Sequence, residues 1–201
     1  MTKRTIQEIE ASYSERATRL LRGWYERRDV IAGATEAVEG PHAELLTGAQ
    51  RAEAAYQQKA ERAGAEAEGC RREYLELTEE RNAAVRARVR SLHKEVYAVE
   101  GADVLSRAAL ATDAQLGAMT ELAATTGNVE LGRAVFVAAE QRGLGEVTSR
   151  YLDAMGEDAR QAYEELRAAP SEESMERKLE DADKLFPAPT AQDFAPALGT
   201  V

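Results

Sequence analysis

The sequence predicts an all-α protein, and three observations carry that prediction. No proline occurs from His42 to Ala169, although proline interrupts helix interiors because it lacks an amide donor and clashes with the preceding turn. The same stretch is rich in alanine, glutamate, arginine and leucine, which are strong helix formers. Its apolar side chains recur every three or four residues, as on one face of a helix. We predict a long antiparallel helical hairpin, then a small helical bundle and an extended C-terminal arm.

The hairpin is expected to occupy residues 1–100, and its first helix has a clear start and end. Thr5 and Glu8 form a capping box, in which each side chain satisfies a free amide at the helix start. Gly40 and Pro41 mark the end, because glycine adopts the left-handed cap conformation and proline suits the first turn of the next helix. The apolar stripe between these signals is Ile6, Ile9, Tyr13, Ala17, Leu20, Trp24, Ile31 and Val38.

The second hairpin helix is predicted from Pro41 to about Val99. Gly64 and Gly69 interrupt its interior, and each costs about 1 kcal/mol relative to alanine, which leaves the continuity of the helix open. The first helix, expected between Thr5 and Gly40, is shorter than the second and can cover only part of it. The apolar stripe from Leu77 to Val99 must therefore meet the C-terminal region or another subunit, because a helix with one exposed apolar face is poorly stable alone.

Residues 101–169 are predicted to form a compact acidic bundle of shorter helices. Thr112 and Gln115 make a second capping box, Gly127 and Asn128 end one helix and cap the next, and Gly143 starts another turn. The expected helices span 103–111, 113–126, 129–142 and 146–168.

Beyond the bundle, Ser171 can cap a short helix within residues 170–186. Residues 187–201 contain three prolines and no helical period, so we expect an extended arm. Phe186, Phe194 and Leu198 are its predicted anchors on a partner.

Charge and cysteine content limit the possible functions. The formal net charge is −10, with 17 basic and 18 acidic residues in 1–100 and 9 basic and 18 acidic residues in 101–201. The acidic second half argues against broad binding to nucleic acid or anionic lipid. The single cysteine, Cys70, excludes an internal disulfide and a cysteine zinc site. The start of the sequence lacks the apolar core of a signal peptide, and the expected location is a cytoplasm.

The segment 81–94 is the strongest candidate for a partner-binding surface. It carries five basic residues and no acidic residue, and its apolar residues fall on one helical stripe. We expect it to dock on an acidic, partly apolar surface, which the acidic half of this chain or of another copy would supply. The predicted contact residues are Arg81, Val85, Arg86, Arg88, Val89, Arg90, Leu92 and Lys94.

No nucleotide-binding, nucleophile or metal-ligand motif is found, so we predict no catalytic residue, no cofactor and no metal. The leading hypothesis is a non-enzymatic structural or assembly protein that forms a homo-oligomer or larger complex. In its alanine-rich charged helices, long hairpin and proline-rich arm the chain resembles bacteriophage scaffolding and virion-associated proteins, which implies a virion or host cytoplasm. A second hypothesis is a regulatory adaptor that binds nucleic acid or protein through residues 81–94. A third is an enzyme, which would require a buried acidic pair within residues 101–169.

Overall fold

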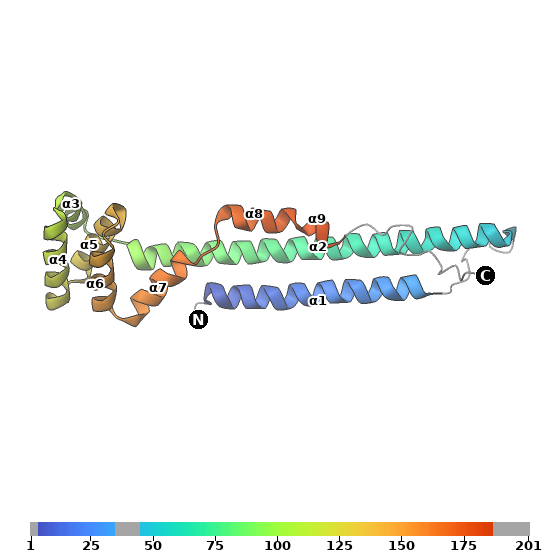
Figure 1. Ribbon diagram of the computed structural model, residues 1–201, viewed down its shortest axis with the longest axis horizontal. Coiled ribbons are helices and arrows are strands. Elements are labelled where there is room, and N and C mark those ends of the chain that lie inside the picture. The colour runs from blue at the N-terminus through green and yellow to red at the C-terminus, as the bar shows by residue number, and fades with distance from the viewer. Residues whose placement is uncertain (1–3, 35–44, 187–201) are drawn as a thin grey trace. The chain divides into compact units, whose positions relative to one another are not determined.

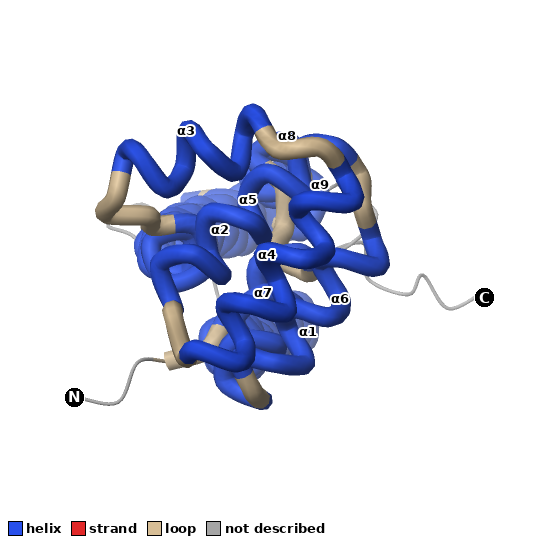
Figure 2. Tube along the Cα trace, turned by 90° about the vertical axis from the view of Figure 1, so that its left-hand side faces the viewer, coloured by secondary structure: helices blue, strands red, loops and turns tan. Residues whose placement is uncertain are grey.

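The computed structural model describes residues 4–34 and 45–186, and every regular element within these ranges is an α-helix (Figure 2). The chain is therefore all-α, as predicted. The helices are α1 (Ile6–Gly33), α2 (Gly48–Tyr97), α3 (Ala102–Leu110), α4 (Asp113–Thr126), α5 (Val129–Arg142), α6 (Gly145–Met155), α7 (Glu157–Arg167), α8 (Glu172–Glu180) and α9 (Ala182–Leu185).

The chain divides into two compact units. The hairpin unit comprises Gln7–Ala83 and Ser171–Val201, and so combines nearly all of α1, most of α2, and the helices α8 and α9. The bundle unit comprises Ala84–Pro170 together with Met1–Ile6. The long helix α2 thus contributes to both units, with its last turns in the bundle unit.

In the hairpin unit, α1 lies antiparallel to α2 (Figure 1). The helix α1 ends at Gly33, and the turn expected at Gly40 lies outside the described residues. The helix α2 begins at Gly48, later than expected, behind a capping box that the sequence analysis missed. In this box the Thr47 backbone amide donates to Gln50 Oε1 over 2.9 Å, and the Gln50 amide donates to Thr47 Oγ1 over 3.4 Å.

The helix α2 is a single element of 50 residues, about 75 Å long at 1.5 Å per residue. It continues through both Gly64 and Gly69. A Cβ added at either glycine would meet no atom within 4 Å, so no close packing requires a glycine there.

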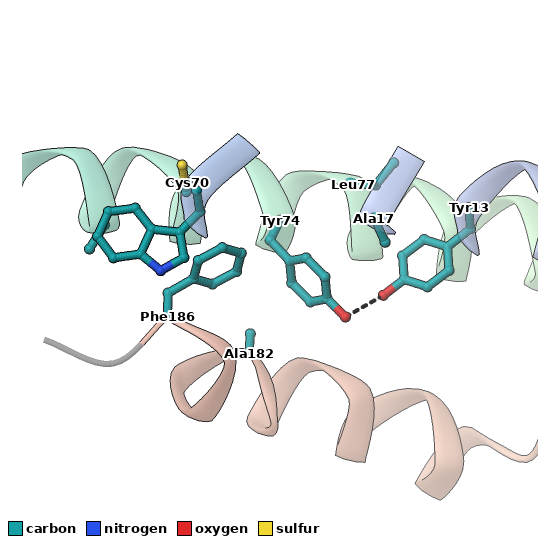
Figure 3. Close-up of a cluster of buried hydrophobic side chains, with 9 residues drawn as sticks. Tyr13, Ala17, Cys70, Tyr74, Leu77, Ala182 and Phe186 are labelled. Atoms are coloured by element: carbon teal, nitrogen blue, oxygen red, sulfur yellow. Dashed lines mark hydrogen bonds between the residues drawn. The ribbon is translucent and has the colours of Figure 1, made fainter. Parts of the chain in front are cut away.

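The helices α8 and α9 pack against one side of the hairpin. Met175, Ala182 and Phe186 are buried, and the last two join a cluster with Trp24 and Tyr74 (Figure 3). The rings of Tyr74 and Phe186 meet edge to face with centroids 5.5 Å apart. The hairpin unit is therefore a three-layered helical rod over this part of its length, and not a bare pair of helices.

The bundle unit is organised around α5. Phe136 on α5 is fully buried and contacts Tyr151 of α6, Tyr163 of α7 and Tyr97 of α2. Val96 joins the same cluster. The apolar stripe near the end of α2 is thus covered by this chain's own bundle unit, one of the two partners that the sequence analysis allowed.

The predicted helix boundaries within the bundle are mostly confirmed. Thr112 and Gln115 form the expected capping box, and Asn128 caps α5 by accepting from the Leu131 amide over 3.0 Å. The prediction of one helix over 146–168 is wrong, because the chain divides there into α6 and α7. Gly156 separates them with a φ of 87°, a conformation that breaks a right-handed helix and that only glycine adopts at little cost.

Candidate helix-docking groove

The residues of the predicted basic surface have very different environments. Arg81, Val85 and Leu92 are buried within the chain. Arg86, Arg88 and Val89 are half-buried, and only Arg90 and Lys94 are exposed. The structure therefore does not present these eight residues as one open surface.

Arg81 belongs to the interior of the hairpin unit. Its side chain is 2% exposed, forms an ion pair with Glu10 of α1 and donates to Asn82 Oδ1 over 2.6 Å. The second Glu10 oxygen accepts from Lys178 of α8 over 3.4 Å. Burial would raise the pKa of Glu10, but its bonds and charge interactions with Arg81 and Lys178 lower that pKa below its ordinary value. The expected partner contact of Arg81 is thus corrected to an internal one, because a buried guanidinium requires a nearby carboxylate.

Arg88 is neutralised within the bundle unit. Its Nε and Nη2 donate to the two carboxylate oxygens of Glu165 on α7, over 3.0 and 2.6 Å. Glu165 Oε1 also accepts from the Ile6 amide over 2.7 Å. Burial raises the pKa of Glu165, but these donors outweigh it and hold the pKa below its usual range. At Arg88, the acidic half of the same chain supplies the counter-charge.

Phe186 is an anchor within the chain itself. It is 4% exposed and packs in the hairpin cluster, so it is not available to a separate partner. The other two predicted anchors, Phe194 and Leu198, lie outside the described residues.

The side of the hairpin that carries α8 and α9, which we call the covered face, holds a buried polar network. The Tyr13 hydroxyl donates to the Tyr74 hydroxyl over 2.8 Å (Figure 3), and lies 3.2 Å from Thr78 Oγ1. Asn82 donates to the backbone carbonyl of Met175 over 3.2 Å, which ties α8 to α2. Burial, with the Tyr13 hydrogen bond, raises the pKa of Tyr74. Of these hydrogen bonds, the one from Asn82 depends on α8 staying in place, whereas those of Tyr13, Tyr74 and Thr78 join α1 and α2.

A groove runs between α1 and α2 on the other side of the hairpin. On α2, Glu80 lines this groove and Asn82 contacts α8. Residues two positions apart along a helix differ in direction by about 160° around its axis, so the groove and α8 lie on opposite sides of α2. The groove has a volume of about 410 Å³. It is lined by Arg16, Arg19, Leu20, Gly23, Arg27, Cys70, Glu73, Glu76, Leu77 and Glu80.

A second groove of about 360 Å³ continues on the same side, toward the end of α1. Val30 in its wall is 72% exposed. Together the two grooves form what we call the open face. Five of its α1 residues are spaced in alternating steps of four and three, the spacing of a coiled-coil seam: Arg16, Leu20, Gly23, Arg27 and Val30. Arg19 and Ile31 of α1 also line the grooves.

The first groove of the open face has an apolar floor between borders of opposite charge, whereas the α2 wall of the second groove carries the basic residues Lys59 and Arg62. Leu20 and the buried Leu77 and Cys70 form part of the floor. The α1 border is basic in the first groove and the α2 border is acidic. The border residues are Arg16, Arg19 and Arg27 on α1, and Glu73, Glu76 and Glu80 on α2.

Gly23 lies in the middle of this face, and no contact within the described part of the chain requires a glycine there. A Cβ at residue 23 would meet no atom within 4 Å. A glycine in a helix interior costs about 1 kcal/mol relative to alanine. Its lack of a side chain lowers the ridge of α1 and would let another helix approach closely.

Cys70 in the floor is a poor nucleophile in this setting. Its thiol is buried, and burial raises its pKa although Arg27 lies 3.9 Å from the sulfur. We therefore assign Cys70 to packing.

Residues 101–169 contain no buried acidic pair of the kind that the enzyme hypothesis requires. Every Asp and Glu in this fully described range is exposed or half-buried. The three half-buried ones have specific partners: Glu165 in the Arg88 pair, Glu140 in a 2.5 Å bond from the Tyr163 hydroxyl, and Glu130 in a 3.1 Å bond from the Glu100 amide.

No protein-family model, curated protein or solved structure matches this chain. Within residues 4–34 and 45–186, no helix combines the length and apolar character of a bilayer span. The same part of the chain contains no cluster of three histidine, cysteine or acidic side chains arranged to hold a metal ion.

The open face was not predicted from the sequence. Its signal is a stripe on α1 that shares Leu20 with the main apolar stripe and continues through Gly23, Arg27 and Val30 in steps of three, four and three. A stripe in which arginine and glycine alternate with leucine and valine does not stand out by hydrophobicity.

Proposed function

We propose that this protein is a non-enzymatic assembly protein that works through helix-to-helix contacts in a larger complex. The open face of the hairpin unit is the observation that carries the proposal. It offers an apolar floor, charged borders and coiled-coil spacing over a length that α8 and α9 do not cover. A bacteriophage virion or capsid-assembly complex is the setting that the composition and helix layout favour.

The charge pattern supports a helix as the ligand of this face. A small-molecule site is usually an enclosed apolar pocket with a few polar groups. Here the apolar strip is long and narrow, and ionisable side chains of both signs border it. An amphipathic helix lays its apolar stripe into such a groove and sets its own charges against the borders.

Site-specific photo-crosslinking in the cells that make the protein tests the proposal. A benzophenone amino acid at Val30 on the open face is compared with one at Tyr25, which is 45% exposed on another side of α1. We expect position 30 to give one dominant adduct that maps to a helical segment of a protein in the same complex, and position 25 to give none. Equal labelling from both positions, or no adduct from position 30, would contradict the proposal.

A second candidate is an adaptor that binds nucleic acid through α2. The exposed side chains of Arg90 and Lys94, one helical turn apart, favour it, with Arg86 nearby. This function requires affinity that falls steeply with salt and that disappears when all three residues become glutamate. Binding that survives the triple substitution would eliminate it.

A further inference from the structure

We propose that the ligand of the open face is the open face of a second copy of this chain, related by a two-fold axis parallel to the hairpin helices. This inference rests on the proposed function and deepens it by naming the partner. The assembly would be a four-helix bundle made from two hairpins, with α1 of each copy beside α2 of the other.

The distribution of charge selects a second copy. In the first groove the α1 border carries Arg16, Arg19 and Arg27, and the α2 border carries Glu73, Glu76 and Glu80. A groove with its positive charge on one side and its negative charge on the other, as in the first groove, is complementary to itself after a two-fold rotation. A foreign helix would need the reverse pattern by a separate coincidence.

The same charges select the direction of the axis. A two-fold parallel to the helices places the basic border of α1 against the acidic border of the second copy's α2. A two-fold perpendicular to the helices within the interface would place α1 against α1, with arginines of Arg16–Arg27 facing one another. Juxtaposed like charges disfavour that arrangement.

The register within the chain fits the parallel axis. Arg16 Nη1 lies 3.0 Å from Glu80 Oε2, and Arg27 Nη1 lies 3.2 Å from Glu66 Oε2, so arginines and glutamates already stand at equal heights along the hairpin. A rotation about a parallel axis preserves these heights. Each arginine would therefore meet a glutamate of the second copy at the level where it now meets its own.

The floor of the open face suits such a contact. Leu20 and Val30 project from α1 on either side of Gly23, which has no side chain. Side chains from the second copy could enter the gap above Gly23, as knobs enter holes in a coiled coil. Closure would also cover Val30, whose side chain is otherwise mostly exposed.

Sedimentation equilibrium of the purified full chain tests the inference, using charge substitutions. We expect the natural chain to be a dimer. Arg16→Glu with Arg19→Glu should raise the dimer dissociation constant by at least ~10-fold, because acidic borders would then face one another. Adding Glu76→Arg and Glu80→Arg to the same chain exchanges the charges at the Arg16 end of the two borders and should restore dimerisation to within a few-fold of the natural chain.

A matched control separates this effect from a general effect of charge. Arg22→Glu with Arg72→Glu makes the same change in net charge at exposed positions outside both grooves, and should leave the dimer intact. Circular dichroism of all variants should show unchanged helix content.

Three results would overturn the inference: a natural chain that is monomeric at all concentrations, a dimer insensitive to the Arg16 and Arg19 reversal, or a four-fold variant as weak as the reversal alone. If the purified chain is monomeric but position 30 still crosslinks to another protein in cells, only the identity of the partner is wrong. If both experiments fail, the proposed function fails as well.

Discussion

The two faces of the α1–α2 hairpin differ in what fills them. On the covered face, α8 and α9 bury Met175, Ala182 and Phe186 and complete the hydrogen bonds of an internal polar network. On the open face, α1 and α2 present grooves, exposed charges and the side chain of Val30, and no helix among the described residues covers them. Where a helix covers the hairpin, apolar side chains are buried and polar groups are hydrogen-bonded. The open face lacks such a covering helix among the described residues, which indicates a place for one from a partner.

The largest expected effect is the removal of the aromatic anchor of the covered face. Phe186→Ala should lower the free energy of unfolding by about 3 kcal/mol, because it leaves a cavity in the cluster around Trp24 and Tyr74. Chemical denaturation measures the change. Val30→Ala on the open face is the matched truncation and should cost less than about 0.5 kcal/mol. Equal losses would mean that the two faces are not different in packing.

A somewhat smaller effect is expected for the internal ion pair. Arg81→Met should destabilise the chain by about 2 kcal/mol, because it leaves Glu10 without its main partner in a partly buried site. Arg16→Met on the open face removes an ion pair in which both side chains are more than half exposed, and should cost less than about 0.5 kcal/mol. A loss at Arg16 as large as that at Arg81 would contradict the distinction.

The pH dependence of stability sharpens the same comparison. The pKa of folded Glu10 lies below its ordinary value of 4.5, so its ionised form stabilises the fold above that pH. This contribution is lost as the pH falls below 4.5 and through the lower, folded pKa. The stability difference between the natural chain and Glu10→Gln should therefore shrink on acidification, as measured by denaturation between neutral pH and about pH 3. A difference that stays constant across this range would contradict the assignment.

The smallest effect concerns Gly23 and Gly64, two of the helix-interior glycines, which lie on different sides of the hairpin. Gly23→Ala and Gly64→Ala should each raise the stability of the dilute chain by about 1 kcal/mol, because neither added methyl meets an atom within 4 Å. Thermal unfolding provides the measurement. If Gly23→Ala destabilises the monomer, the glycine has an internal role that our account denies.

The helices were predictable because their signals are local. Thr112, Asn128 and Ser171 cap helices where their side chains predicted, through contacts that reach only three residues. The division at Gly156 was missed because glycine also occurs inside helices of this chain, as at Gly64. Only the backbone conformation distinguishes the two cases.

The docking surface was harder to predict because it depends on contacts between distant parts of the sequence. Residues 81–94 do form a basic stripe, but Arg81 finds Glu10 and Arg88 finds Glu165, each more than 70 positions away. Charge counted along a helix does not reveal such partners. Conversely, the open face combines residues of α1 and α2 whose pairing is fixed only by the hairpin register.

The mass of the assembly formed by two leucine variants tests the central claim most directly. Gly23→Leu places a large side chain on the open face, whereas Gly64→Leu places the same side chain on another side of the hairpin, and both positions have open space around the Cβ. Light scattering should find the natural mass for Gly64→Leu and a folded monomer for Gly23→Leu. A Gly23→Leu chain that assembles as well as the Gly64→Leu chain would show that the open face is not where this protein binds its partner.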